Sequence, residues 1–253
     1  MSGEAATADN IMRVNKRLLR QAVRTDVAAL SQDAVRAQSQ QVAIRLMRLP
    51  EFARARAVAA FDGIEGKELD TAPLLAVALQ GEKRVFLPRC LGKRGDNERH
   101  FGGMTFLPVA DLSTLESWPR NSWGIREPPF GDKDAENFAP VPLHLQQQWQ
   151  RQCAETQALI DVFLVPGSAF SEQGARLGQG CGFYDRYLTA YQQRRQQLGL
   201  EPATLVGVAL DQQKHDELPL EPHDVRMDIV VFPSGAFRHG EPLSDDNLNL
   251  DAE

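Results

Sequence analysis

Short apolar runs that alternate with helix-like segments are the feature that most constrains how this chain can fold. Strands that alternate with helices build a mostly parallel sheet with helices on both faces. The runs that we predict to be buried strands are residues 56–61, 84–88, 104–108, 160–166, 204–210 and 227–232. The segments predicted to be helices are residues 10–30, a segment that starts after Ser31 and ends at Pro50, residues 70–79 and residues 183–198. We therefore predict an α/β fold with about five or six strands.

The apolar pattern covers residues 10–233, which we predict to form a single domain. Residues 1–9 and 234–253 contain few apolar side chains, so we expect both ends to be disordered, the second as an acidic tail. Two polar stretches, near 90–103 and 129–156, interrupt the pattern and are predicted to be surface insertions.

The charge balance argues against one broad class of function. Lys and Arg total 28 against 34 Asp and Glu, a formal charge of −6, which does not suit a protein that coats nucleic acid. No apolar run approaches about 20 residues, so no membrane span is predicted. Three widely spaced cysteines, Cys90, Cys153 and Cys181, favour neither a disulfide framework nor a zinc site. We expect a cytoplasmic location, and a mitochondrial one stays open.

A glycine-rich segment at the start of the predicted helix 183–198 is the richest candidate for a binding site. Gly178, Gly180 and Gly182 alternate, which lets successive backbone N–H groups turn toward an anion, and Arg176 adds a planar donor that fits phosphate. The helix N-terminus adds partial positive charge. The segment matches neither the dinucleotide fingerprint nor the P-loop. A polyphosphate cradle is predicted, and a glycine loop without a ligand is the alternative.

Two carboxylates and two cations elsewhere in the chain suit the same ligand. Asp185 and Asp224 are candidate ligands of Mg²⁺, which binds carboxylates together with phosphate oxygens. Asp185 is equally suited to stabilising a helix start, and Asp224 to a simple turn. Lys16 and Arg20 lie four residues apart on one helix face, so they either reach phosphates or form a solvated face.

Two further residues are candidates for contact with a planar ligand. Glu68 follows the predicted strand 56–61, as either a helix cap or an acid that faces the ligand. Trp123 lies in a predicted loop, as either a core residue or a stacking platform. Cys181, between two glycines, has no histidine nearby in sequence and is predicted to be a filler rather than a nucleophile.

The order of these motifs resembles that of the 5-formyltetrahydrofolate cyclo-ligase family, over residues 13–233. The strongest run is Asp161-Val162-Phe163-Leu164-Val165-Pro166-Gly167, then Ala169-Phe170, Gly174, Arg176-Leu177-Gly178, Gly180, Gly182 and Tyr184-Asp185. The resemblance implies conversion of 5-formyltetrahydrofolate to 5,10-methenyltetrahydrofolate with ATP and Mg²⁺. It also implies the fold type of phosphosugar isomerases and coenzyme A transferases, and we expect a monomer that acts on the mono- or polyglutamyl substrate. The alternatives are a sugar-phosphate isomerase and an inactive nucleotide- or folate-binding homologue.

The resemblance also assigns roles to residues. It assigns ATP binding to Lys16, Arg20, Arg176, Leu177, Gly178, Gln179, Gly180, Cys181, Gly182, Phe183 and Tyr184. It assigns the magnesium ion to Asp185 and Asp224. It assigns contacts with the folate substrate to Glu68, Trp123, Gly180, Gly182 and Tyr184. Three positions depart from the family pattern, Gln179, Cys181 and Phe183, which puts the side-chain contacts of this loop in doubt.

Overall fold

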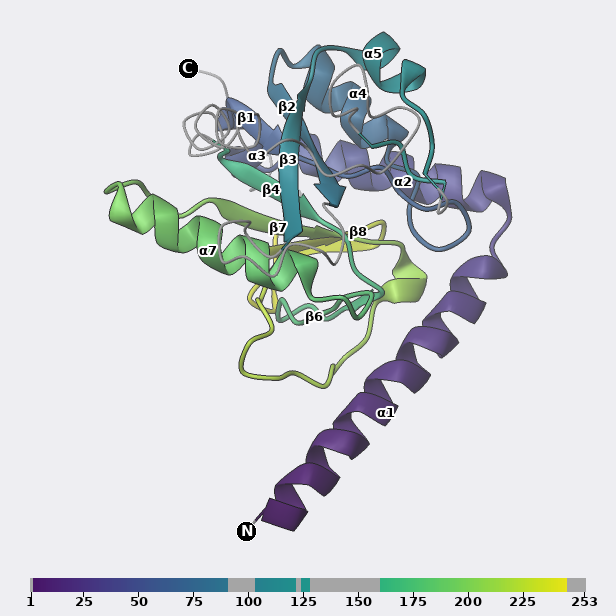
Figure 1. Ribbon diagram of the computed structural model, residues 1–253. Coiled ribbons are helices and arrows are strands. Elements are labelled where there is room, and N and C mark those ends of the chain that lie inside the picture. The colour runs from purple at the N-terminus through teal and green to yellow at the C-terminus, as the bar shows by residue number, and fades with distance from the viewer. Residues whose placement is uncertain (1, 91–102, 122–123, 128–159, 245–253) are drawn as a thin grey trace.

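The computed structural model describes residues 2–90, 103–121, 124–127 and 160–244 (Figure 1). Its described part holds an eight-stranded sheet with the order β10-β9-β8-β7-β4-β1-β2-β3. The strands are β1 (Ala57–Ala59), β2 (Arg84–Cys90), β3 (Met104–Val109), β4 (Val162–Val165), β7 (Thr204–Val208), β8 (Ile229–Phe232), β9 (Gly235–Arg238) and β10 (Glu241–Pro242). The strands from β8 to β2 run parallel, whereas β3, β9 and β10 pair antiparallel at the two edges. The predicted mostly parallel sheet is confirmed.

The described helices are α1 (Ser2–Ala28), α2 (Gln32–Met47), α3 (Pro50–Arg54), α4 (Ala72–Gln80), α5 (Leu112–Ser117) and α7 (Phe183–Gln197). Four of them, α1, α2, α4 and α7, lie close to the predicted segments, whereas α3 and α5 were not predicted. Ser31 caps α2, because its side chain accepts a hydrogen bond from the backbone N–H of Ala34 at 3.2 Å. Helix α2 ends just before Pro50, as predicted, and Pro50 itself begins α3, where a first-turn proline loses no hydrogen bond.

Alternation along the strands explains why helices cover both faces of the sheet. In β4, Val162 and Leu164 belong to the apolar cluster shared with α2 and α4, whereas Phe163 and Val165 belong to the cluster shared with α7. Tyr187 of α7 is fully buried in this second cluster. Figure 1 shows α7 on one side of the sheet and α2 to α4 on the other. Helices on both faces are therefore confirmed.

The two ends of the chain depart from the expectation of disorder. Helix α1 begins at Ser2, within the residues 1–9 that were predicted to be disordered. The prediction for 234–253 is wrong for its first part, because β9 pairs with β8, and β10 pairs with β9. Ala236 is 1% exposed there. Sheet pairing satisfies backbone groups whatever the side chains are, so composition alone underestimated this segment.

Several predictions fall outside the described residues. They concern most of the insertion near 90–103, the insertion at 129–156, the end of the acidic tail after residue 244, and Trp123. Among the helices that the structure describes, none is both long enough and apolar enough to cross a membrane.

Candidate functional site

The candidate site lies where β1 and β4 end, the edge at which open parallel sheets bind ligands. Beyond β4 the chain forms a small hairpin of β5 (Ala169–Phe170) and β6 (Arg176–Leu177) and then the glycine loop, residues 178–182. The predicted loop 168–182 therefore contains two short strands. Helix α7 starts directly after the glycine loop.

The glycine loop has the backbone form that the sequence predicts for an anion site. Gly180 and Gly182 have φ angles of 100° and 65°, a region that favours glycine. Gly182 is the N-cap of α7 and provides no side-chain cap, so the first N–H groups of the helix are free of a side-chain partner. Gly178 is small for another reason, since a Cβ there would lie 3.1 Å from Arg176 Nη1. These features suit a polyphosphate.

Helix α1 reaches this loop from a distant part of the sequence. The Nε of Arg20 donates a hydrogen bond to the carbonyl oxygen of Gly178 at 2.7 Å. Figure 1 shows α1 running away from the body of the molecule toward the N-terminus, so its C-terminal half carries the contacts with the site. The structure thus brings Arg20 to the glycine loop, as predicted.

Arg176 and Asp185 form a buried ion pair beside the glycine loop. Nη2 of Arg176 lies 2.6 Å from Oδ1 of Asp185, and the two side chains are only 3% and 15% exposed. Arg176 Nη1 also donates to the carbonyl oxygen of Pro166 at 3.2 Å, and Asp185 accepts from the backbone N–H of Val225 at 3.1 Å. Within the described residues, the buried Nε of Arg176 has no partner. This pair anchors the first turn of α7 to β6.

A second cluster of charges surrounds Lys16. Its Nζ lies 2.8 Å from Oε2 of Glu221 and 2.6 Å from Oδ2 of Asp224. Burial alone would lower the pKa of Lys16, but the hydrogen bonds and charges of Asp224 and Glu221 outweigh it and raise that pKa. The pKa of Asp224 falls, because its hydrogen bonds and the charge of Lys16 outweigh burial, which would raise it. Lys16 is therefore held firmly as a cation.

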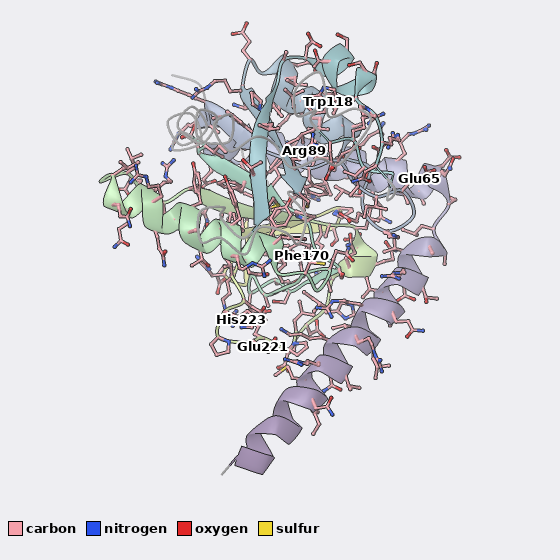
Figure 2. All side chains as sticks on the ribbon, in the orientation of Figure 1. Glu65, Arg89, Trp118, Phe170, Glu221 and His223 are labelled. Carbon is pink, nitrogen blue, oxygen red and sulfur yellow. The ribbon has the colours of Figure 1, made fainter. Side chains whose placement is uncertain are left out.

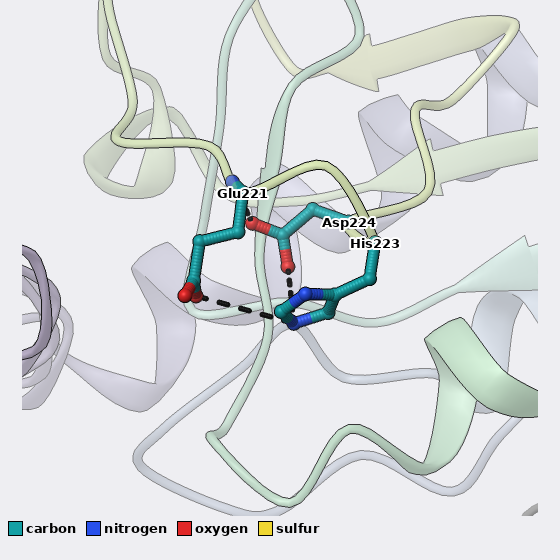
Figure 3. Close-up of side chains that lie close together, drawn as sticks. All are labelled: Glu221, His223 and Asp224. Carbon is teal, nitrogen blue, oxygen red and sulfur yellow. Dashed lines mark hydrogen bonds and ion pairs between the residues drawn. The ribbon is translucent and has the colours of Figure 1, made fainter. Parts of the chain in front are cut away.

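Glu221, His223 and Asp224 form a compact group with metal-ligating atoms within 4.8 Å of one another (Figure 3). His223 Nε2 lies 3.8 Å from Oδ1 of Asp224 and 4.0 Å from Oε2 of Glu221. Figure 2 shows Glu221 and His223 together on the side of the molecule where α1 lies. Asp185 is not in this group, so a cation shared by Asp185 and Asp224 stays a prediction. Asp224 was predicted to be either a turn residue or a magnesium ligand. Glu221 and His223 were not predicted as site residues, because nothing in the sequence pairs Glu221 with Lys16.

A third group of polar residues lies between the glycine loop and the segment after β1, and in it Glu68 is buried whereas Gln179 is exposed. Glu68 is 5% exposed, and Nε2 of Gln179 lies 3.5 Å from its Oε1. Burial raises the pKa of Glu68 to about 7, although Lys67 and the hydrogen bond from Gln179 lower it. The hydroxyl of Tyr184 is buried without a partner in the described part of the chain, and burial and the charge of Glu68 raise its pKa. A polar ligand could satisfy these groups.

The remaining predicted residues take varied positions. Leu177 is buried in β6, Cys181 is exposed on the glycine loop, and Phe183 begins α7. The site therefore gathers the predicted residues that the structure describes along one edge of the sheet, and adds Glu221 and His223 to them.

Comparisons with known proteins agree with this picture. The model of the 5-formyltetrahydrofolate cyclo-ligase family matches residues 12–233. A probable 5-formyltetrahydrofolate cyclo-ligase of Schizosaccharomyces pombe is 28% identical over 231 residues, which cover 90% of this chain and 100% of that protein. The 5-formyltetrahydrofolate cyclo-ligase of Escherichia coli K12 is 33% identical over 206 residues, covering 81% of this chain and 93% of that protein.

A solved structure supports the same relation. The NMR structure of 5,10-methenyltetrahydrofolate synthetase from Aquifex aeolicus superposes with a TM-score of 0.60 and 27% sequence identity. The match covers 90% of this chain and 95% of that one.

Proposed function

The chain belongs to the 5-formyltetrahydrofolate cyclo-ligase family, and we propose that it converts 5-formyltetrahydrofolate to 5,10-methenyltetrahydrofolate with ATP and Mg²⁺. ADP and phosphate are the other products. A sugar-phosphate isomerase is not favoured, because the family match runs over residues 12–233. We further propose that the protein acts as a monomer in the cytoplasm, and that its fold is related to that of phosphosugar isomerases and coenzyme A transferases.

The observation that carries the proposal is the convergence of two arginines on the glycine loop, Arg20 from 158 residues away and Arg176 from directly before it, with Lys16 one helical turn before Arg20 on α1. Arg20 binds the carbonyl of Gly178, Arg176 lies against Gly178, and Lys16 is held by the 221–224 segment. Cations and free backbone N–H groups around a glycine loop suit the phosphates of ATP. Lys16, Arg20, Arg176 and the loop from Leu177 to Tyr184 would hold the nucleotide.

The carboxylates present fit a magnesium ion. Oxygen atoms of Glu221 and Asp224 already converge on one cation, the Nζ of Lys16, and hard oxygen ligands are those that Mg²⁺ prefers. Asp224 and Asp185 would hold the ion. When bound, the ion would neutralise charge on the phosphates of ATP.

The proposed reaction requires the protein to position two substrates and does not require a nucleophile from the protein. The formyl oxygen attacks the γ-phosphate, ADP leaves, and the formyl carbon becomes an imidate phosphate. The N10 amine then bonds to that carbon, and the ring closes as the carbon–oxygen bond breaks, with the N10 proton leaving together with the phosphate. Holding both substrates in line contributes roughly 7–11 kcal/mol to such a reaction. Arg20, Arg176 and the glycine loop would balance the charge on the transferred group.

The other half of the site would receive the folate. Glu68 and Tyr184 offer a carboxyl and a hydroxyl in a buried setting, which suits a pterin ring edged with donors and acceptors. Gly180 and Gly182, between the two halves, would let the reacting groups approach the backbone closely. Trp123, outside the described residues, is proposed as a stacking partner.

One assay tests the proposal. The purified protein is incubated with 5-formyltetrahydrofolate, with and without Mg-ATP, and methenyl absorbance and ADP are followed together. We expect equal amounts of both products, and none without ATP. As a matched pair of variants, Asp224→Asn should lose most of the turnover, whereas Asp33→Asn, an exposed carboxylate of α2, should keep it. No methenyl product from folded wild-type protein would identify an inactive homologue and overturn the proposal.

A further inference from the structure

Two large apolar side chains of α2 stay exposed, although the helix packs its other face against the sheet. Ile44 and Met47 lie one helical turn apart and are 45% and 44% exposed. Arg48, the C-cap of α2, is also exposed and follows Ile44 by four positions, so it lies on the same part of the surface. We call these three residues the α2 patch. Residues 34–50 contain three arginines and no acidic residue, so the helix around the patch carries positive charge.

The last described strand leads the chain toward this side of the molecule. Strand β10 pairs with β9, and beyond it the backbone N–H of Leu243 donates to the carbonyl oxygen of Ala236 at 2.8 Å. Leu243 packs against the apolar cluster that the sheet shares with α2. Arg45 of α2 holds the turn before β9, because its Nε donates to the carbonyl oxygen of Pro233 at 3.0 Å. Since the antiparallel pairing continues toward Pro233, the described chain ends at Ser244 near the C-terminal half of α2.

The sequence that follows Ser244 is complementary to the α2 patch. Residues 245–253 contain Leu248 and Leu250, four acidic residues and no cation. Residues two apart point to the same side of an extended chain, so both leucines can face one surface. Four residues of extended chain span at most about 14 Å, which lets Leu248 reach across a helix of about 10 Å diameter. The segment therefore has the side chains and the reach to cover the patch.

We propose that the α2 patch is the docking site of residues 245–253 of the same chain. The two leucines would cover Ile44 and Met47, and the acidic residues on either side of them would lie near Arg48. Burial of the apolar side chains would favour the docked state, and the opposite charges would fix its position. The segment would then fasten β10 to the helix layer. Composition predicts disorder for an isolated acidic segment, whereas a surface of opposite charge within reach allows such a segment to order on binding.

A second copy of the chain is the rival occupant of the patch, and two observations weigh against it. A stable dimer buries about 800 Å² on each partner, which two side chains that are each less than half exposed do not supply. Two α2 patches that face each other across a two-fold axis would also bring Arg48 of both copies together, and like charges at an interface repel. The acidic segment of the same chain meets neither obstacle.

Oxidation of Met47 by dilute hydrogen peroxide measures whether the patch is covered in the full chain. Peroxide converts an accessible methionine to its sulfoxide, and peptide mass spectrometry follows Met47 against Met12 of α1 as the internal reference. The double variant Leu248→Ser, Leu250→Ser removes the proposed apolar contacts, and Asn247→Ser, Asn249→Ser is its matched control. We expect the leucine variant to raise the rate at Met47 about threefold or more, because the thioether becomes accessible. The rate at Met12 should not change, and the asparagine variant should match wild type.

A charge reversal tests the ionic part of the docking. Arg48→Glu should speed the oxidation of Met47, and adding Asp245→Lys and Asp246→Lys to it should slow the oxidation again. Rescue is the informative readout because Arg48 is also the C-cap of α2, and a damaged cap would not be repaired by lysines in the tail. Absence of rescue would overturn the assignment of Arg48 as the partner of these carboxylates.

Three outcomes would overturn the docking itself. Equal rates at Met47 in wild type and in the leucine variant would show that the segment does not cover the patch. An equal effect of the asparagine variant would show that any change in the segment loosens the surface. A rate that falls as the protein concentration rises, and that is the same in both variants, would assign the patch to a second copy. None of these measurements requires turnover, so the inference can fail while the proposed function holds, and the reverse.

Discussion

On the side of the site formed by α7 and the 221–224 segment, Arg176 and Lys16 each have carboxylate partners. Where the first turn of α7 meets Glu68, in contrast, the hydroxyl of Tyr184 is buried without a partner in the described part of the chain. Arg24 of α1, which lines a pocket with Lys67, has no partner there either. We refer to these as the paired side and the unpaired side. The difference suggests that the protein holds the paired side in shape by itself, whereas the unpaired side is completed by what binds there.

The largest expected effect comes from breaking the paired side. Arg176→Ala would leave Asp185 buried beside the uncapped start of α7 without its cation, so we expect a loss of about 3–5 kcal/mol in the free energy of unfolding. Urea denaturation measures it, with the exposed Arg17→Ala as the control. A loss below about 1 kcal/mol would mean that the pair behaves like a surface ion pair.

The same geometry changes what is expected of Asp185. An exposed metal ligand could be replaced by asparagine without affecting the fold. Because Asp185 accepts from both Arg176 and Val225, Asp185→Asn should lower the thermal midpoint together with the activity. A large loss of turnover at an unchanged midpoint would contradict this, and would mean that the ion pair contributes little to stability.

On the unpaired side we expect a substitution to change the free energy of unfolding by a smaller amount and to increase it. Burial raises the pKa of Glu68 from its ordinary value of 4.5 to about 7. Between these pH values the folded protein keeps a proton that the unfolded chain has lost, so stability falls as the pH rises through this window. Glu68→Gln removes this loss, and at pH 8 the variant should be more stable than wild type by up to about 3 kcal/mol.

Unfolding measured at pH 5 and pH 8 checks the sign of this effect. The advantage of Glu68→Gln should grow between the two pH values, whereas Glu65→Gln, an exposed residue of the same segment, should show no such growth. An advantage that does not change with pH would mean that Glu68 is ionised in the folded protein throughout. Turnover of Glu68→Gln should fall even though its stability rises, since the carboxyl is proposed to contact the substrate.

The smallest expected effect is a difference in reactivity between two thiols, those of Cys90 and Cys181. Burial and then the neighbouring charges of Glu127 and Cys181 raise the pKa of Cys90 to about 11, whereas Cys181 is exposed on the glycine loop. Because the thiolate is the reactive form, iodoacetamide should modify Cys181 well before Cys90. Mg-ATP should slow the reaction at Cys181 and leave Cys90 unchanged, as peptide mass spectrometry can resolve. Equal rates at Cys181 with and without Mg-ATP would contradict the assignment of the loop to the nucleotide.

The sequence reveals those parts of the fold that depend on continuous apolar runs. The strands β4 and β8 are buried on both faces, so they stand out as short hydrophobic segments. In contrast, β9 and β10 depend on backbone pairing at the sheet edge, which leaves little mark on composition. Strands of this kind can be identified only from a structure or from a pairing partner that is already known.

The candidate site shows the same limit. The glycine loop and Arg176 could be predicted, because their residue types carry the chemistry locally. The ion-pair partners of the cations could not be predicted. Lys16 and Asp224 are 208 positions apart, and a salt bridge at that separation has no local signature in the sequence. The burial of Glu68 could not be predicted either, because it follows from how the segment after β1 packs against Gln179.

The contacts of α1 also bear on the order in which the protein can assemble. Lys16 leaves the ribosome before its partners Glu221 and Asp224, which follow it by 205 and 208 residues. Lys16 therefore stays without its carboxylates until the segment 221–224 has been synthesised. Contacts of such long sequence separation form late, because the loop that they close must be ordered first. A nascent chain can build the early strands of the sheet, but the ligand site is completed only once translation has passed residue 224.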